Sequence, residues 1–107
     1  MKKILFVCSQ NKLRSPTGEA VFGSEAGVEA RSAGLNNNAE IPLGAEDVEW
    51  ADIIFVMEPV HKRKLSKRFK DKLKGQRVIC LGIPDNYDYM DPELVEIFKR
   101  DVPQFIY

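Results

Sequence analysis

A cysteine and an arginine stand near the start of the chain with five residues between them, in the stretch FVCSQNKLRSP at residues 6–16. Cys8 follows an apolar run, and Arg14 precedes a serine and a proline. A thiolate is a good nucleophile, and the planar guanidinium of arginine can hold two oxygens of a phosphoryl group. This spacing predicts a phosphate-binding loop with a nucleophile at its base. A buried thiol before a basic turn is the plainer alternative.

The segments around this stretch predict how it is positioned. Near-continuous apolar runs at residues 2–8, 51–57 and 77–83 are typical of parallel strands buried on both faces. A shorter strand with alternating exposure is predicted at residues 28–34. Because strands alternate with helical patterns, we expect an α/β fold: a three-layer sandwich with a four-stranded parallel sheet, built as a single domain from residues 1–107.

Helices are predicted between and after these strands. The first begins after Arg14, with Ser15 as its cap and Pro16 at its first position. In the third, apolar residues recur every four positions beneath a basic face. The predicted helices lie at residues 15–27, 45–50, 59–73 and 91–98.

Composition and charge limit the class of protein. With 44% hydrophobic and 30% charged residues, the chain is ordinary for a globular domain. The apolar run that starts at Ile4 is too short for a signal peptide or a membrane span, so we expect a cytoplasmic protein with reduced cysteines and no membrane partner.

More than half of the sixteen lysines and arginines lie within residues 61–77. We interpret this segment as a solvated helix face with His61 exposed on it. A nucleic-acid partner is disfavoured, because no aromatic residues alternate with the charges.

The loop after Cys8 has the chemistry of an anion site. In an open parallel sheet, ligands bind outside the carboxyl ends of the strands, which is where Cys8 is expected. Backbone N–H groups of the loop can curl around a phosphate or sulfate anion, aided by the helix dipole, whose field also favours a thiolate. Ser15 can donate its hydroxyl to the sulfur. The predicted anion-binding residues of this loop are Ser9, Gln10, Asn11, Lys12 and Leu13.

The pattern C-x5-R-[ST], present as CSQNKLRS, resembles the signature loop of cysteine-dependent phosphatases. Its place after the first strand is similar to that in low-molecular-weight protein tyrosine phosphatases. The landmarks RSPTGEAVF, RSAG, WADIIFVME and IPD follow in that family's order. The chain looks like a short variant, because the segment between RSAG and WADIIF is reduced; one wall of the cleft should therefore be lower.

The resemblance implies a catalytic scheme. It makes Cys8 the nucleophile of a cysteinyl-phosphate mechanism, Arg14 the transition-state clamp and Ser15 the donor to the thiolate. It also implies that Asn11 takes an unusual backbone conformation that keeps the loop open. No metal or other cofactor is implied.

Three aspartates in IPDNYDYMDPEL are candidates for the general acid. Asp91 precedes a proline and a helical pattern, where an N-cap role suffices. Asp85 has the family's spacing to an aromatic wall residue, Tyr87, although Asn86 replaces the family's proline. We interpret Asp85 as the acid and base, with Asp88 as second choice.

Two other residues depart from the family's pattern, and they bear on substrate specificity and on protection of the nucleophilic cysteine from oxidation. Lys12 stands where the family usually has an aliphatic residue or threonine, and Leu13 where it often has a second cysteine. Cys80 should lie two strands away from Cys8, beyond disulfide reach. The sequence therefore predicts a protein tyrosine phosphatase acting on a phosphotyrosine-containing protein or a small aryl phosphate. The alternative is a phosphatase-like module that binds phosphate or phosphoprotein with little turnover.

Overall fold

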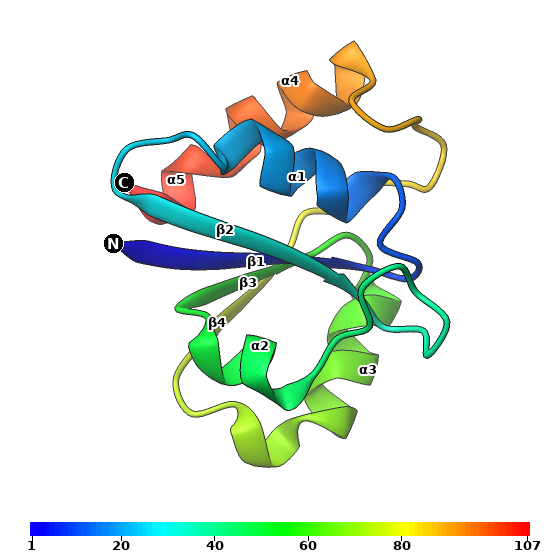
Figure 1. The fold of residues 1–107 in the computed structure, drawn as a ribbon, viewed down its shortest axis with the longest axis vertical. Helices are drawn as coiled ribbons and strands as arrows, with labels where there is room; N and C mark the ends of the chain where they lie inside the picture. The colour runs from blue at the N-terminus through cyan, green and yellow to red at the C-terminus, as the bar shows by residue number, and fades with distance from the viewer.

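The computed structural model describes all 107 residues. Its centre is a parallel sheet whose strands run in the spatial order β2-β1-β3-β4, covered by helices on both faces (Figure 1). The strands are β1 (Lys2–Cys8), β2 (Val28–Gly34), β3 (Ile53–Val56) and β4 (Arg77–Cys80). The predicted α/β three-layer sandwich with four parallel strands is confirmed.

The helices form two separate layers. In Figure 1, α1, α4 and α5 lie over one face of the sheet, and α2 and α3 lie over the other. The helices are α1 (Arg14–Phe22), α2 (Ala45–Trp50), α3 (Pro59–Arg68), the short 3₁₀ helix η1 (Lys70–Lys72), α4 (Pro92–Asp101) and α5 (Pro103–Ile106). None of them is both long enough and apolar enough to cross a membrane.

The central strand β1 has an uninterrupted apolar sequence because its side chains enter two cores. Phe6 packs in the core beneath α1 and α4, while Leu5 and Val7 pack in the core beneath α2 and α3. Phe6 stacks on Phe55 at a ring-centroid distance of 5.4 Å and meets Phe98 of α4 edge to face at the same distance. A strand buried on both faces requires an uninterrupted apolar run.

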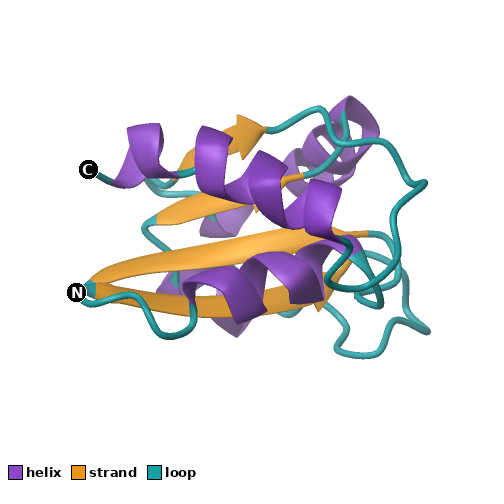
Figure 2. Ribbon diagram, turned by 90° about the horizontal axis from the view of Figure 1, so that it is seen from above, coloured by secondary structure: helices purple, strands orange, loops and turns teal.

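The carboxyl ends of the strands lie at one edge of the sheet, and the loops that follow them gather there (Figure 2). The register pairs Cys8 with Gly34 at this edge. Cys80 lies on β4, two strands from β1, as expected, and both cysteines are free.

Several local predictions differ from the structure. Helix α1 begins at Arg14, so Ser15 lies within its first turn and is buried, rather than acting as its cap. The third helix ends at Arg68, and the short helix α5 was not predicted. The solvent-facing position predicted for His61 is wrong: this side chain is buried, because the exposed face of α3 is made by its lysines and arginines.

Candidate active site

The loop between β1 and α1 closes around the sulfur of Cys8. Asn11 adopts a φ of +57°, in the left-handed region that asparagine tolerates better than most residues. This conformation turns its backbone N–H toward Cys8, with the nitrogen 3.3 Å from Sγ. Successive loop amides can thereby face the same point above the sulfur.

A buried side-chain network orients a hydroxyl toward the sulfur. The Asn11 amide nitrogen donates to Ser15 Oγ at 2.9 Å, and that oxygen lies 3.0 Å from Cys8 Sγ. Because Ser15 Oγ accepts from Asn11, its own proton is free to be donated to the sulfur or to the Ala33 carbonyl 3.4 Å away. Such a donor stabilises a thiolate.

Arg14 is only 3% exposed, and groups from two distant loops hold its guanidinium. Its Nη1 donates to Glu58 Oε2 at 2.6 Å and to the Ile83 carbonyl at 2.8 Å. Its Nε lies 3.5 Å from Asp85 Oδ1. These partners compensate the cost of burying the charge and determine the plane of the guanidinium.

Glu58, whose carboxylate contacts Arg14, was not among the site residues predicted from the sequence. It follows β3 at the carboxyl edge of the sheet, and the hydrogen bond from Arg14 lowers its pKa. One feature of the sequence could have identified Glu58: it comes directly after a buried strand, where side chains reach the ligand site.

His61 joins the same cluster. Its Nε2 lies 3.0 Å from Ser9 Oγ, and its Nδ1 accepts a hydrogen bond from the backbone N–H of Glu58 at 3.1 Å. Burial lowers the pKa of His61, and the positive charge of Arg14 lowers it further.

A cavity of about 170 Å³ opens above the sulfur. It brings together predicted site residues from the loop and from the segment after β4. Those that line it are Cys8, Ser9, Gln10, Lys12, Leu13, Arg14 and Asp85. A phosphoryl group in this space would meet a nucleophile, a guanidinium and a carboxyl group.

The other two acid candidates are placed differently. The carboxylate of Asp91 accepts a hydrogen bond from the Glu93 N–H at 2.9 Å and so caps α4, as the structural interpretation predicted. Asp88 is exposed, and its carbonyl accepts from the Asp91 N–H. Neither lines the cavity above Cys8.

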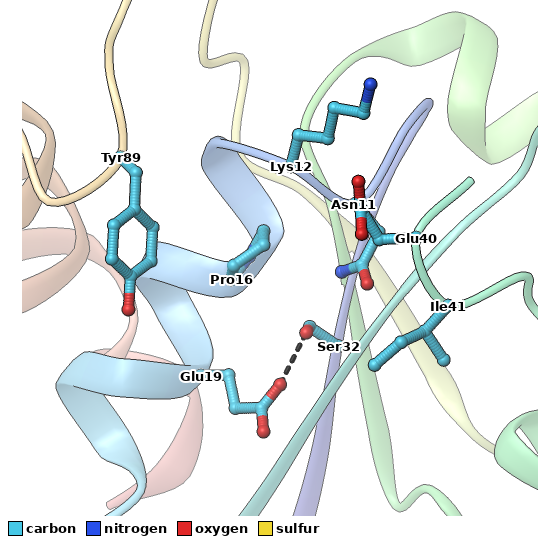
Figure 3. Close-up of a pocket in the computed structure, with 8 residues that line it drawn as sticks. All are labelled: Asn11, Lys12, Pro16, Glu19, Ser32, Glu40, Ile41 and Tyr89. Atoms are coloured by element: carbon cyan, nitrogen blue, oxygen red, sulfur yellow. Dashed lines mark hydrogen bonds between the residues drawn. The ribbon is translucent and has the colours of Figure 1, made fainter.

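The two tyrosines of the segment after β4 lie in different surroundings. Tyr87 packs against the core beneath α1 and α4 and does not line the cavity above Cys8. The exposed Tyr89 borders a second hollow of about 460 Å³ (Figure 3). In that hollow Glu19 is hydrogen-bonded to Ser32. Lys12 lines both spaces.

Comparisons with known proteins identify one relative by sequence and several by fold. No protein-family model matches the chain. The protein-arginine-phosphatase of Bacillus subtilis is 29% identical over 129 aligned positions, which cover 91% of this chain and 85% of that protein.

Two solved structures share the fold over nearly their full length. A YwlE mutant from Bacillus subtilis superimposes with a TM-score of 0.79 at 23% identity, with both chains covered completely. The low-molecular-weight protein tyrosine phosphatase of Streptococcus pyogenes superimposes with a TM-score of 0.78 at 17% identity, covering 99% of this chain and 91% of that one.

Proposed function

We infer that this chain belongs to the low-molecular-weight protein tyrosine phosphatase family, and we propose that it hydrolyses phosphorylated protein side chains through a cysteinyl-phosphate intermediate. The observation that carries the proposal is the cavity in which Cys8, Arg14 and Asp85 meet. These three side chains are the nucleophile, the clamp and the proton donor that such a reaction needs.

In the first step the Cys8 thiolate attacks phosphorus, and the bond from phosphorus to the leaving atom breaks. Arg14 and the loop N–H groups hold the equatorial oxygens as negative charge spreads over them. Asp85, in its acid form, transfers its proton to the leaving atom, which departs neutral. The products of this step are the dephosphorylated side chain and the S–P bond.

In the second step a water molecule attacks phosphorus. The Asp85 carboxylate takes a proton from that water, and the S–P bond breaks to release inorganic phosphate. The sulfur leaves as a thiolate, which the Ser15 hydroxyl stabilises across the 3.0 Å contact. Asp85 is then protonated again and Cys8 is again a thiolate, as at the start of the cycle.

Phosphotyrosine is the substrate that we favour, with phosphoarginine as the second candidate. Lys12 lines the cavity and places a positive charge where the rest of the substrate residue must pass. A neutral phenyl ring tolerates that charge better than a cationic guanidinium does. Phosphoarginine is supported by the activity named for the Bacillus subtilis relative.

The chemical proposal is tested by hydrolysis of p-nitrophenyl phosphate in the presence of a chelator. We expect turnover by the wild-type protein and no measurable turnover by Cys8→Ser. Full activity of that variant, or inactivity of the wild type, would refute the cysteinyl-phosphate mechanism.

The substrate proposal needs matched peptides that carry either phosphotyrosine or phosphoarginine. Wild-type kcat/KM should be higher for the phosphotyrosine peptide. The variant Lys12→Met, which keeps the length and loses the charge, should shift the ratio of the two values toward phosphoarginine by about five-fold, or about 1 kcal/mol, the Coulomb energy of two charges several ångströms apart in a polar site. A higher wild-type rate on phosphoarginine would reverse the assignment.

The alternative is a module that binds phosphate or phosphoprotein without turnover. It is favoured if phosphate binds to the wild type with micromolar affinity while hydrolysis is negligible and Asp85→Ala leaves that low rate unchanged. We place the activity in the cytoplasm, where a reducing environment preserves a nucleophilic thiol.

A further inference from the structure

The buried side chain of His61 contacts the phosphate-binding loop through Ser9. His61 comes from the first turn of α3, is 1% exposed, and places its Nε2 3.0 Å from the hydroxyl oxygen of Ser9. These residues are 52 positions apart in sequence. Ser9 lines the cavity above Cys8, so the contact connects α3 directly to the site.

The hydrogen bonds determine which ring nitrogen of His61 carries the proton. The backbone N–H of Glu58 can only donate, so Nδ1, which lies 3.1 Å from that nitrogen, must present its lone pair. A neutral ring with an unprotonated Nδ1 carries its hydrogen on Nε2. Ser9 Oγ is therefore the acceptor of the Nε2–H hydrogen bond.

This assignment restricts the Ser9 hydroxyl. With one of its lone pairs occupied by His61, its hydrogen must be donated elsewhere, and the side chain borders the space where a phosphoryl oxygen binds. On the basis of the proposed phosphatase function, we propose that His61 is a positioning residue: it holds the Ser9 hydroxyl as a hydrogen-bond donor to the phosphoryl group. His61 acts through Ser9 and does not touch the substrate.

The groups around the ring favour its neutral form. Arg14 from α1 and Lys64 from α3 lower the pKa of His61, in addition to burial, while Glu58 and Asp85 oppose them. Protonation of Nδ1 would also place two donors face to face at Glu58. The neutral ring, and with it the donor role of Ser9, is the form that the surroundings select.

The test is a double-mutant cycle read by calorimetric binding of inorganic phosphate at pH 7. Ser9→Ala and His61→Phe should each weaken phosphate binding about ten-fold, the effect of losing one hydrogen bond to a charged group. The double variant should bind no more weakly than Ser9→Ala alone, because His61 acts only through that hydroxyl. His61→Gln, whose amide N–H can replace Nε2–H, should bind within about two-fold of the wild type.

Three results would overturn the inference. One is unchanged phosphate affinity in Ser9→Ala, which remains informative even if His61→Phe does not fold. Another is the same loss from His61→Phe with and without the Ser9 hydroxyl. The third is failure of His61→Gln to restore binding while its thermal unfolding matches that of the wild type. Because phosphate binding requires no turnover, these outcomes are separate from a failure of the proposed hydrolysis.

Discussion

Arg14 shows how one buried charge is held ready for chemistry. Glu58 neutralises it at 2.6 Å, and the Ile83 carbonyl accepts a further hydrogen bond from the same nitrogen, Nη1. A guanidinium held in this way loses little freedom when it binds an anion, which is the advantage of a preorganised site. Asp85 is more exposed and lies 3.5 Å from Arg14 Nε, so it contacts the guanidinium less closely than Glu58 does.

The role of Asp85 as general acid can be tested by comparing the activities of variants at Asp85 and Asp91. We expect Asp85→Asn to lower kcat for phenyl phosphate about 100-fold or more, the usual contribution of a general acid. The loss should be smaller for p-nitrophenyl phosphate, whose leaving group needs less protonation. Steady-state kinetics on the two substrates measure the difference.

Asp91→Asn is the matched control for this measurement. Asparagine caps a helix as well as aspartate does, so both activity and stability should stay close to the wild type. An equal loss of activity in the two variants would contradict the role of Asp85.

At the scale of elements, three segments after parallel strands assemble the site. Cys8 ends β1, Glu58 follows β3, and Asp85 lies beyond β4. The parallel arrangement places all three at one edge of the sheet, which is the physical reason that this fold can build such a site. The end of β2 contributes differently: it supports the loop from beneath through Gly34.

Gly34 allows the close approach of the loop to β2. A Cβ atom at this position would lie 2.5 Å from Ala39 Cβ, 2.7 Å from the Ser9 carbonyl oxygen and 3.0 Å from the Asn11 nitrogen. We therefore expect Gly34→Ala to lower the free energy of unfolding by about 1–3 kcal/mol, as overpacking does. It should also weaken phosphate binding, because two of the three atoms that the new Cβ would displace belong to the phosphate-binding loop. Thermal unfolding and calorimetry measure the two effects.

Gly44→Ala is the control for this substitution. The nearest atom to a Cβ there is 3.9 Å away, so we expect only a small change in stability and none in phosphate affinity. If Gly34→Ala behaved like Gly44→Ala, the proposed support of the loop by β2 would be wrong.

For the whole molecule, stability rests on two cores separated by the sheet. Phe98 is fully buried and attaches α4 to Phe6 of the central strand. We expect Phe98→Ala to cost about 3–5 kcal/mol, a large part of the stability of a small domain. Urea unfolding measures this loss. Tyr107→Ala, at a residue that is 73% exposed, should stay within about 0.5 kcal/mol of the wild type.

The pH dependence of stability should report the burial of His61. Its pKa is lowered from 6.5 in the folded protein, so the unfolded chain takes up the proton more readily. The free energy of unfolding must then fall as pH drops below about 6.5, by at most about 1.4 kcal/mol per pH unit. Urea unfolding at pH 7.0, 6.0 and 5.5 measures the slope.

The chain contains a single histidine, which makes this slope assignable. The pKa of Glu58 is also lowered, but its contribution to stability is lost only as pH falls below 4.5, the ordinary pKa of a glutamate, which is outside this range. His61→Gln should therefore have a flatter profile. An identical slope in the variant would mean that another group titrates there.

Much of the fold and the centre of the site follow from local sequence patterns. Apolar runs identify buried strands, and the C-x5-R spacing places nucleophile and guanidinium around one point, because a short loop between a strand and a helix has few ways to close. The positive φ of Asn11 was likewise anticipated from the motif. Among the three aspartates after β4, Asp85 was chosen as the acid from its resemblance to the family, because the local patterns of these residues are compatible with more than one role.

The tertiary structure decided which distant residues complete the site. Glu58 reaches Arg14 across 44 positions and His61 reaches Ser9 across 52. The lysines and arginines around His61 concealed its buried position, because a helix can be basic on one face and packed on the other. Tyr87 was assigned to the pocket from its resemblance to the family, whereas it is partly buried against the core. Periodicity and motifs describe neighbours along the chain, whereas these contacts depend on how the strand ends and α3 come together in space.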